Sequence, residues 1–77
     1  MNKLLFFAGL KEIVNSDKLE LDMAGKTVKE VKAELTQQYG DLRLESVMTA
    51  INEEFAFEDD IIEKNDVIAF IPPVSGG

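Results

Sequence analysis

Hydrophobic residues in this chain come in short runs separated by polar turns, a pattern typical of a small protein with both strands and helices. Residues 4–8 and 67–71 are the two most continuously apolar runs, and each has the length of one buried strand. Residues 19–21 and 47–51 and the shorter segment 55–57 are predicted as further strands. The pattern therefore predicts a sheet of four to five strands, with the first and last strands at its centre.

One amphipathic helix is predicted over residues 27–39. Thr27, with Glu30 three positions later, forms a capping-box pattern in which each side chain accepts a hydrogen bond from the other residue's backbone N–H. The apolar residues that follow fall on one helical face. Gly40 comes directly afterwards, where a residue with positive φ often ends a helix. Such a helix must lie against a flat apolar surface, which the sheet supplies.

Smaller features connect these elements. Residues 10–14 predict a short helical turn, and residues 59–63 predict a brief turn that carries Ile61 and Ile62 inward. Met23 and Met48 are expected in the core. The resulting order of strand, strand, helix, strand, short strand and strand is that of an α+β fold of the β-grasp (ubiquitin-like) type, with the first and last strands parallel.

The domain organisation follows from the end of the last strand. Pro72 and Pro73 cannot donate to a sheet ladder, so the sheet is expected to end before them. Residues 1–71 are therefore predicted to form one β-grasp domain. Residues 72–77 are predicted to form an extended, flexible C-terminal tail.

Composition removes many functional classes. The 77 residues include 8 Lys and Arg against 15 Asp and Glu, a net charge of −7, and no Cys or His. Thiolate and histidine catalysis and sulfur- or imidazole-based metal sites are excluded, and we expect no catalytic residue and no metal in so small a chain. The acidic balance argues against nucleic acid and anionic membranes and favours a basic protein partner. The apolar runs are too short to cross a bilayer and no signal peptide is visible, so a cytoplasmic protein is expected.

The first candidate site is an apolar sheet face. One helix covers only one face of the sheet, and strand alternation then leaves Phe7 and Ile71 together on the other face. An exposed apolar patch of this kind usually marks a protein-binding site. The alternative is that a loop at residues 42–44 folds over it.

The second candidate site is the tail that ends in Gly76 and Gly77. Its six residues can extend up to about 20 Å, at roughly 3.3–3.6 Å each. Glycine lacks a Cβ, so the last two residues can enter a channel too narrow for other residues. Together with Val74 and Ser75 they deliver one chemically usable group, the α-carboxylate of Gly77.

An acidic stretch spans residues 53–66. Its members are Glu53, Glu54, Glu58, Asp59, Asp60, Glu63 and Asp66. The spacing and central glycine of an EF-hand are missing. A solvated acidic face that helps to steer the chain toward a basic partner is the favoured interpretation.

Residues 4–8, 50–54 and 66–77 resemble the small subunits of molybdopterin synthases, and the likeness extends over essentially the whole chain. Its most specific part is the ending, residues 70–77, which contains the paired prolines and the two glycines. The Gly-Gly alone is shared with ubiquitin and with the sulfur carrier of thiamine synthesis.

This resemblance implies a sulfur carrier in molybdenum cofactor biosynthesis. An ATP-dependent activating enzyme would adenylate Gly77, and sulfur would replace AMP to give a thiocarboxylate. The tail would then donate sulfur to cyclic pyranopterin monophosphate in the large synthase subunit, which bears the catalytic groups, within a heterotetramer. Phe7, Ile71, Pro72 and Pro73 would contact the large subunit, and the chain itself would bind no cofactor.

Two other functions stay open from the sequence. One is the thiamine-pathway sulfur carrier, which usually lacks the paired prolines. The other is a β-grasp interaction module without transfer chemistry. An autonomous enzyme is disfavoured because the chain offers no nucleophile, base or pocket.

Overall fold

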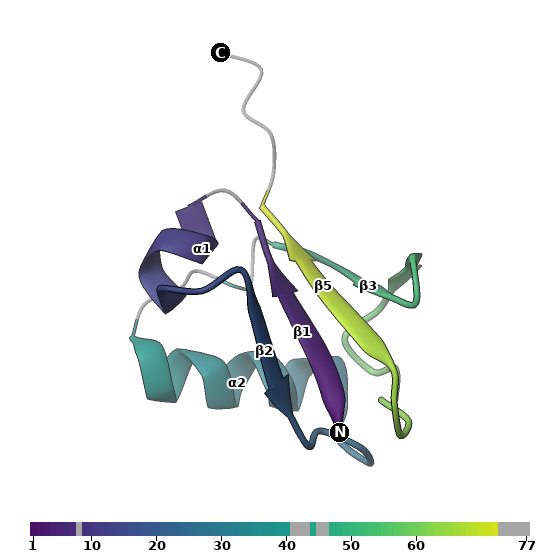
Figure 1. Cartoon of the computed structure of the whole chain (residues 1–77). Coiled ribbons are helices and arrows are strands. Elements are labelled where there is room, and N and C mark those ends of the chain that lie inside the picture. Colours follow the sequence, from purple (N-terminus) through teal and green to yellow (C-terminus); the bar gives the residue numbers. More distant parts are fainter. Residues whose placement is uncertain (8, 41–43, 45–46, 73–77) are drawn as a thin grey trace.

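Five strands form one mixed sheet in the order β2-β1-β5-β3-β4 (Figure 1). The computed structural model of the chain describes residues 1–7, 9–40, 44 and 47–72. Its elements are β1 (Asn2–Phe6), α1 (Gly9–Val14), β2 (Lys18–Leu21), α2 (Val28–Tyr39), β3 (Met48–Ile51), β4 (Glu54–Ala56) and β5 (Val67–Ile71). β1 and β5 are parallel neighbours in the sheet interior, and the other strand pairs are antiparallel. The predicted β-grasp order is confirmed.

The helix α2 lies across one face of this sheet, and the core fills the space between them (Figure 1). Val31 and Leu35 of α2 are fully buried together with Leu4 and Ile68 of the central strands. The rings of Phe6 and Phe70 stack in the same layer with their centroids 5.5 Å apart. Strand alternation thus buries every second residue of β1 and β5 beneath the helix, as the sequence predicts.

The capping box at the start of α2 is present in full. The Thr27 hydroxyl accepts a hydrogen bond from the Glu30 backbone N–H at 3.1 Å, and the Glu30 carboxylate accepts one from the Thr27 N–H at 2.9 Å. The bond from the Thr27 N–H, followed by that from its hydroxyl, lowers the pKa of Glu30 below its ordinary value of 4.5. Gly40 ends the helix with a φ of +92°, which glycine adopts without a Cβ clash.

Replacing the cap gives a first prediction. Thr27→Ala should lower the free energy of unfolding by about 1 kcal/mol at neutral pH, because the Glu30 N–H loses its acceptor. The pKa of Glu30 is lower in the folded chain than in the unfolded chain. Its carboxylate therefore stabilises the fold at pH values above the unfolded-state pKa, and this stabilisation is lost as the pH falls through the folded-state pKa. Urea unfolding should therefore show a smaller difference from wild type in acid. Thr36→Ala, at an exposed helix position, is the control, and an equal loss there would contradict a capping role.

Asn2 holds three chain segments together, which no sequence signal predicted. Its side chain is fully buried, and its Nδ2 donates to the carbonyl oxygens of Glu63 and Asp66 at 2.9 and 3.1 Å. Its Oδ1 accepts from the backbone N–H of Met23 at 2.9 Å. These bonds explain why β1 begins at Asn2, two residues before the predicted strand.

Several local predictions were wrong. Ile62 is fully buried, but Ile61 is 54% exposed. Ile61 forms an isolated bridge with Thr27, and successive side chains of such an extended segment point to opposite sides. Met48 was expected in the core and is 49% exposed, because its place in β3 points it away from α2. The fourth strand ends before Phe57, whose N–H donates to the Asp60 carboxylate instead of a ladder. The strand predicted over residues 4–8 ends at Phe6, and residue 8 lies outside the described residues.

Candidate functional site: an open apolar sheet face

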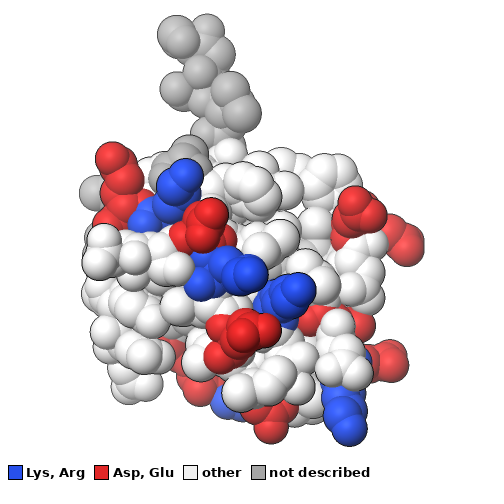
Figure 2. Space-filling model, in the orientation of Figure 1, with Lys and Arg blue, Asp and Glu red and all other residues white. Residues whose placement is uncertain are grey.

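The sheet face opposite α2 carries a continuous set of apolar side chains, which we call the open sheet face. It consists of Leu5, Phe7, Met48, Ala50, Phe55, Val67, Ala69 and Ile71. These residues alternate along their strands with the residues of the core. In Figure 2, which has the orientation of Figure 1, an uncharged area is seen over part of this side of the sheet, with charged side chains at its borders.

The strand register brings this set together from four strands. Leu5 pairs with Ala69, Ala69 with Ala50, and Ala50 with Phe55, so one apolar row crosses the sheet. A second row joins Ile71 to Met48. Phe7 extends this row, because it follows Phe6, which pairs with Phe70.

The large members of the open sheet face are exposed. Phe7 is 47% exposed, Met48 49% and Phe55 71%, while Ile71 is half-buried. Large side chains that gather on one face in this way form the kind of apolar patch that marks a protein-binding site. Phe7 and Ile71 were predicted on this face and the structure brings them together. Met48 and Phe55 were not predicted on this face. Alternation along β3 from the core residue Thr49 places Met48 on it, and pairing with Ala50 across the hairpin places Phe55 on it.

The loop alternative for this face fails where the structure describes it. Leu44 is 1% exposed, and it packs in the core cluster with residues of α2 and the central strands rather than on the opposite face. Leu42 lies outside the described residues. Across the described part of the chain, the cover of the sheet is therefore one-sided.

The predicted tail begins beside the open sheet face. Pro72 is half-buried and directly follows Ile71, the last residue of β5. The other tail residues singled out from the sequence, Pro73, Val74, Ser75, Gly76 and Gly77, lie outside the described residues. The domain boundary at residue 72 therefore stays a prediction.

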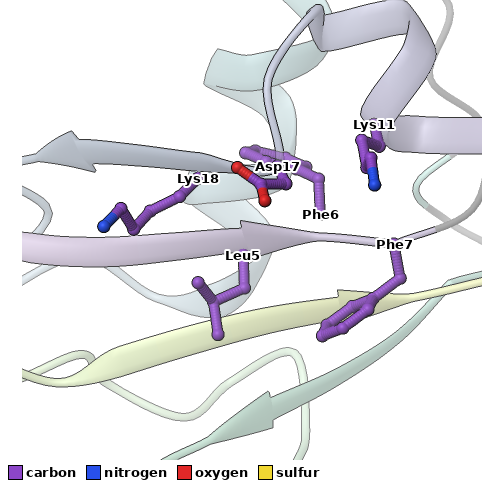
Figure 3. Close-up of a pocket in the computed structure, with 6 residues that line it drawn as sticks. All are labelled: Leu5, Phe6, Phe7, Lys11, Asp17 and Lys18. Carbon is purple, nitrogen blue, oxygen red and sulfur yellow. The ribbon is translucent and has the colours of Figure 1, made fainter.

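A hollow of about 370 Å³ borders the open sheet face at its β2 side. Its lining residues are Leu5, Phe6, Phe7, Lys11, Asp17 and Lys18. Figure 3 shows Leu5 and Phe7 on one side of β1 and Asp17 between the two lysines on the other. An apolar area bordered by charged side chains is typical of protein interfaces, in which a polar rim surrounds an apolar core.

Two carboxylates of the acidic stretch accept hydrogen bonds within turns. The Asp60 carboxylate accepts from the N–H of Phe57 at 2.8 Å, and the Asp66 carboxylate accepts from the N–H of Glu63 at 2.8 Å. Asp66 also accepts from the side-chain amide of Asn52 at 2.8 Å. Within the described residues no group of three or more carboxylates is arranged to hold a metal ion. Two of the acidic side chains are thus structural, which refines the interpretation of the stretch as a solvated face.

Comparison with known proteins identifies the family. A family model described as the ThiS family matches residues 4–77. The chain belongs to the ThiS family. At least four relatives carry the name molybdopterin synthase sulfur carrier subunit, among them the next two. The protein from Dictyostelium discoideum is 38% identical, with 97% of this chain and 94% of the relative aligned. The protein from Arabidopsis thaliana is 35% identical, with 97% of this chain and 81% of the relative aligned.

Solved structures support the fold of this ThiS-family chain. A putative molybdopterin converting factor subunit 1 from Pyrococcus furiosus superposes with a TM-score of 0.83 at 20% identity, covering 95% of this chain and 97% of that one. A complex of subunits 1 and 2 of the molybdopterin-converting factor from Helicobacter pylori gives a TM-score of 0.70 at 24% identity, covering 99% and 97%. In the described part of the chain, no helix is both long and apolar enough to cross a membrane.

Proposed function

We propose that this chain is the sulfur carrier subunit of a molybdopterin synthase. The observation that carries the proposal is the match to the ThiS family, which runs through Gly77, together with relatives of the same name over nearly the full chain. The absence of Cys and His from the sequence agrees with a carrier whose sulfur is held on the main chain. We further propose a cytoplasmic site of action, where ATP is available for activation.

The chemistry proposed for the tail uses one functional group of this chain, the carboxylate of Gly77. An ATP-dependent activating enzyme transfers AMP to the Gly77 carboxylate and releases pyrophosphate, which makes the carbonyl carbon electrophilic. A sulfur nucleophile then displaces AMP, so that a C–S bond forms as the C–O bond to AMP breaks. The product is a C-terminal thiocarboxylate. ATP and sulfur are substrates of the partners, and the chain supplies only the carboxylate and its reach.

The open sheet face is the proposed docking surface for the large synthase subunit. It is apolar and exposed at Phe7, and its member Ile71 directly precedes Pro72, where the predicted tail begins. A subunit bound there would receive Pro73, Val74, Ser75 and Gly76 as the tail enters its active site, and Gly77 would deliver sulfur to cyclic pyranopterin monophosphate. The Helicobacter pylori structure is a complex of subunits 1 and 2 of the molybdopterin-converting factor. We propose a heterotetramer of two small and two large subunits.

A thiamine-pathway sulfur carrier is the second candidate, since the matching family model is described as ThiS. The names of the relatives and the paired prolines favour the molybdopterin branch. A β-grasp interaction module without transfer chemistry is the third candidate.

Intact-mass spectrometry after coexpression with the activating enzyme tests the proposal. The expected result is a mass increase equal to the exchange of one oxygen for sulfur, located at Gly77 by fragmentation. Addition of the large subunit and cyclic pyranopterin monophosphate should reverse it. A terminus that stays unmodified while a known carrier is thiolated in the same assay would overturn the transfer chemistry. Turnover only with thiazole-forming partners would assign the thiamine pathway instead.

A further inference from the structure

A second hollow lies at the edge of the sheet where β3 and β4 meet the side of α2. Its volume is about 330 Å³. It is lined by Lys32, Val47, Met48, Thr49, Phe55, Ala56, Phe57 and Glu58, and we call it the edge hollow. Met48 and Phe55 also belong to the open sheet face. Thr49 and Lys32 lie on the α2 side of the sheet, so a protein bound to the open sheet face would reach them by extending around the β4 edge.

Thr49 gives the edge hollow an unusual polar group. The residue is 4% exposed, and its Oγ1 is buried with no hydrogen-bond partner among the residues that the structure describes. Buried hydroxyl groups in native proteins nearly always have a partner, because losing hydration without replacement is unfavourable. A group that supplies the missing hydrogen bond on binding would remove this penalty.

Lys32 places an ammonium group in the same lining. It is 9% exposed, and its Nζ donates to the Val47 carbonyl oxygen and to Glu58 Oε1, both at 3.3 Å. An ammonium has three protons, so one proton has no acceptor within the described part of the chain. Glu58 already balances the charge of Lys32. A neutral acceptor therefore suits this site better than a second carboxylate.

We propose that the edge hollow receives a glutamine-like side chain, with an aliphatic stem and a neutral amide, from the large subunit that docks on the open sheet face. The stem would lie along Phe55 and Phe57, which are 71% and 80% exposed and would lose water on binding. The amide oxygen would accept from Thr49 Oγ1 and Lys32 Nζ. This inference rests on the proposed function for its partner, and it adds a second anchor point that does not use the tail.

Thr49→Val tests the inference, because valine keeps the shape of threonine and removes the hydroxyl. The melting temperature of the free chain should stay the same or rise, since an unsatisfied buried group is removed and valine favours strands. The affinity for the large subunit, measured by calorimetry, should fall about three- to tenfold through loss of one hydrogen bond. A purely structural role would instead lower the melting temperature.

Ala56→Leu is a second variant that fills the edge hollow and should weaken binding in the same way. Thr36→Val, at an exposed position of α2, is the matched control and should bind as wild type. If Thr49→Val and Ala56→Leu both bind normally while Phe7→Asp does not, the inference is overturned and the proposed docking face stands. If Phe7→Asp also binds normally, the docking face itself is refuted.

Discussion

Deletion of Gly77 should abolish sulfur transfer by the assembled synthase while leaving the fold and the affinity for the large subunit unchanged. Removing one residue withdraws the terminal carboxylate by roughly 3.3–3.6 Å. Because a misplacement of 1 Å can cost about 100-fold in rate, the transfer rate should fall by at least that factor. The measurement is single-turnover conversion of cyclic pyranopterin monophosphate, with subunit affinity measured in parallel.

Gly77→Ala is the matched variant for this deletion. It keeps the length of the tail and its carboxylate and adds only a Cβ, so it should be less damaging than the deletion and should report how narrow the channel is. Normal synthase activity after deletion of Gly77 would refute the tail mechanism. A large loss of subunit affinity would show instead that the terminal residue anchors the complex.

Phe7→Asp should weaken the complex with the large subunit by more than about 30-fold, or about 2 kcal/mol. The substitution removes an aromatic ring from the open sheet face and buries an unpaired carboxylate when the partner docks. The free chain should lose much less, because Phe7 is 47% exposed and lies outside the core. Calorimetric titration and thermal unfolding of the same variant separate the two effects.

Ile13→Asp is the control for Phe7→Asp. Ile13 is 49% exposed on α1 and does not belong to the open sheet face, so the same change of charge there should leave subunit binding intact. A stability loss for Phe7→Asp of about 3–5 kcal/mol, the cost of truncating a buried Phe, would place its ring in the core and contradict the docking role.

The local elements of the fold could be predicted because each has a short-range physical cause. Thr27 and Glu30 cap α2 through bonds between residues three apart, and Gly40 ends it with a positive φ. The alternation of apolar residues in β1 and β5 predicted which side chains the helix buries. It also predicted Phe7 and Ile71 on the uncovered face.

The missed features depend on contacts between distant segments. Asn2 is buried because it bonds to carbonyl groups more than 60 positions away. Met48 and Phe55 are exposed because β3 and β4 pair in a register that turns them away from α2. Ile61 and Ile62 are adjacent residues of the same type, yet only the side chain of Ile62 is buried in the core. Alternation relates the residues within one strand, but which face of that strand meets α2 is set by its pairing with distant segments.

By itself, the sequence determined the β-grasp order of elements and the absence of Cys and His, and it predicted the carboxylate of the Gly-Gly ending as the working group. Those properties follow from residue type and spacing alone. Only the tertiary structure decided how far the open sheet face extends and that an unsatisfied Thr49 hydroxyl and a buried Lys32 line a hollow at its edge. The physical reason is that strand register and burial arise from long-range packing, which brings together residues that the chain keeps apart.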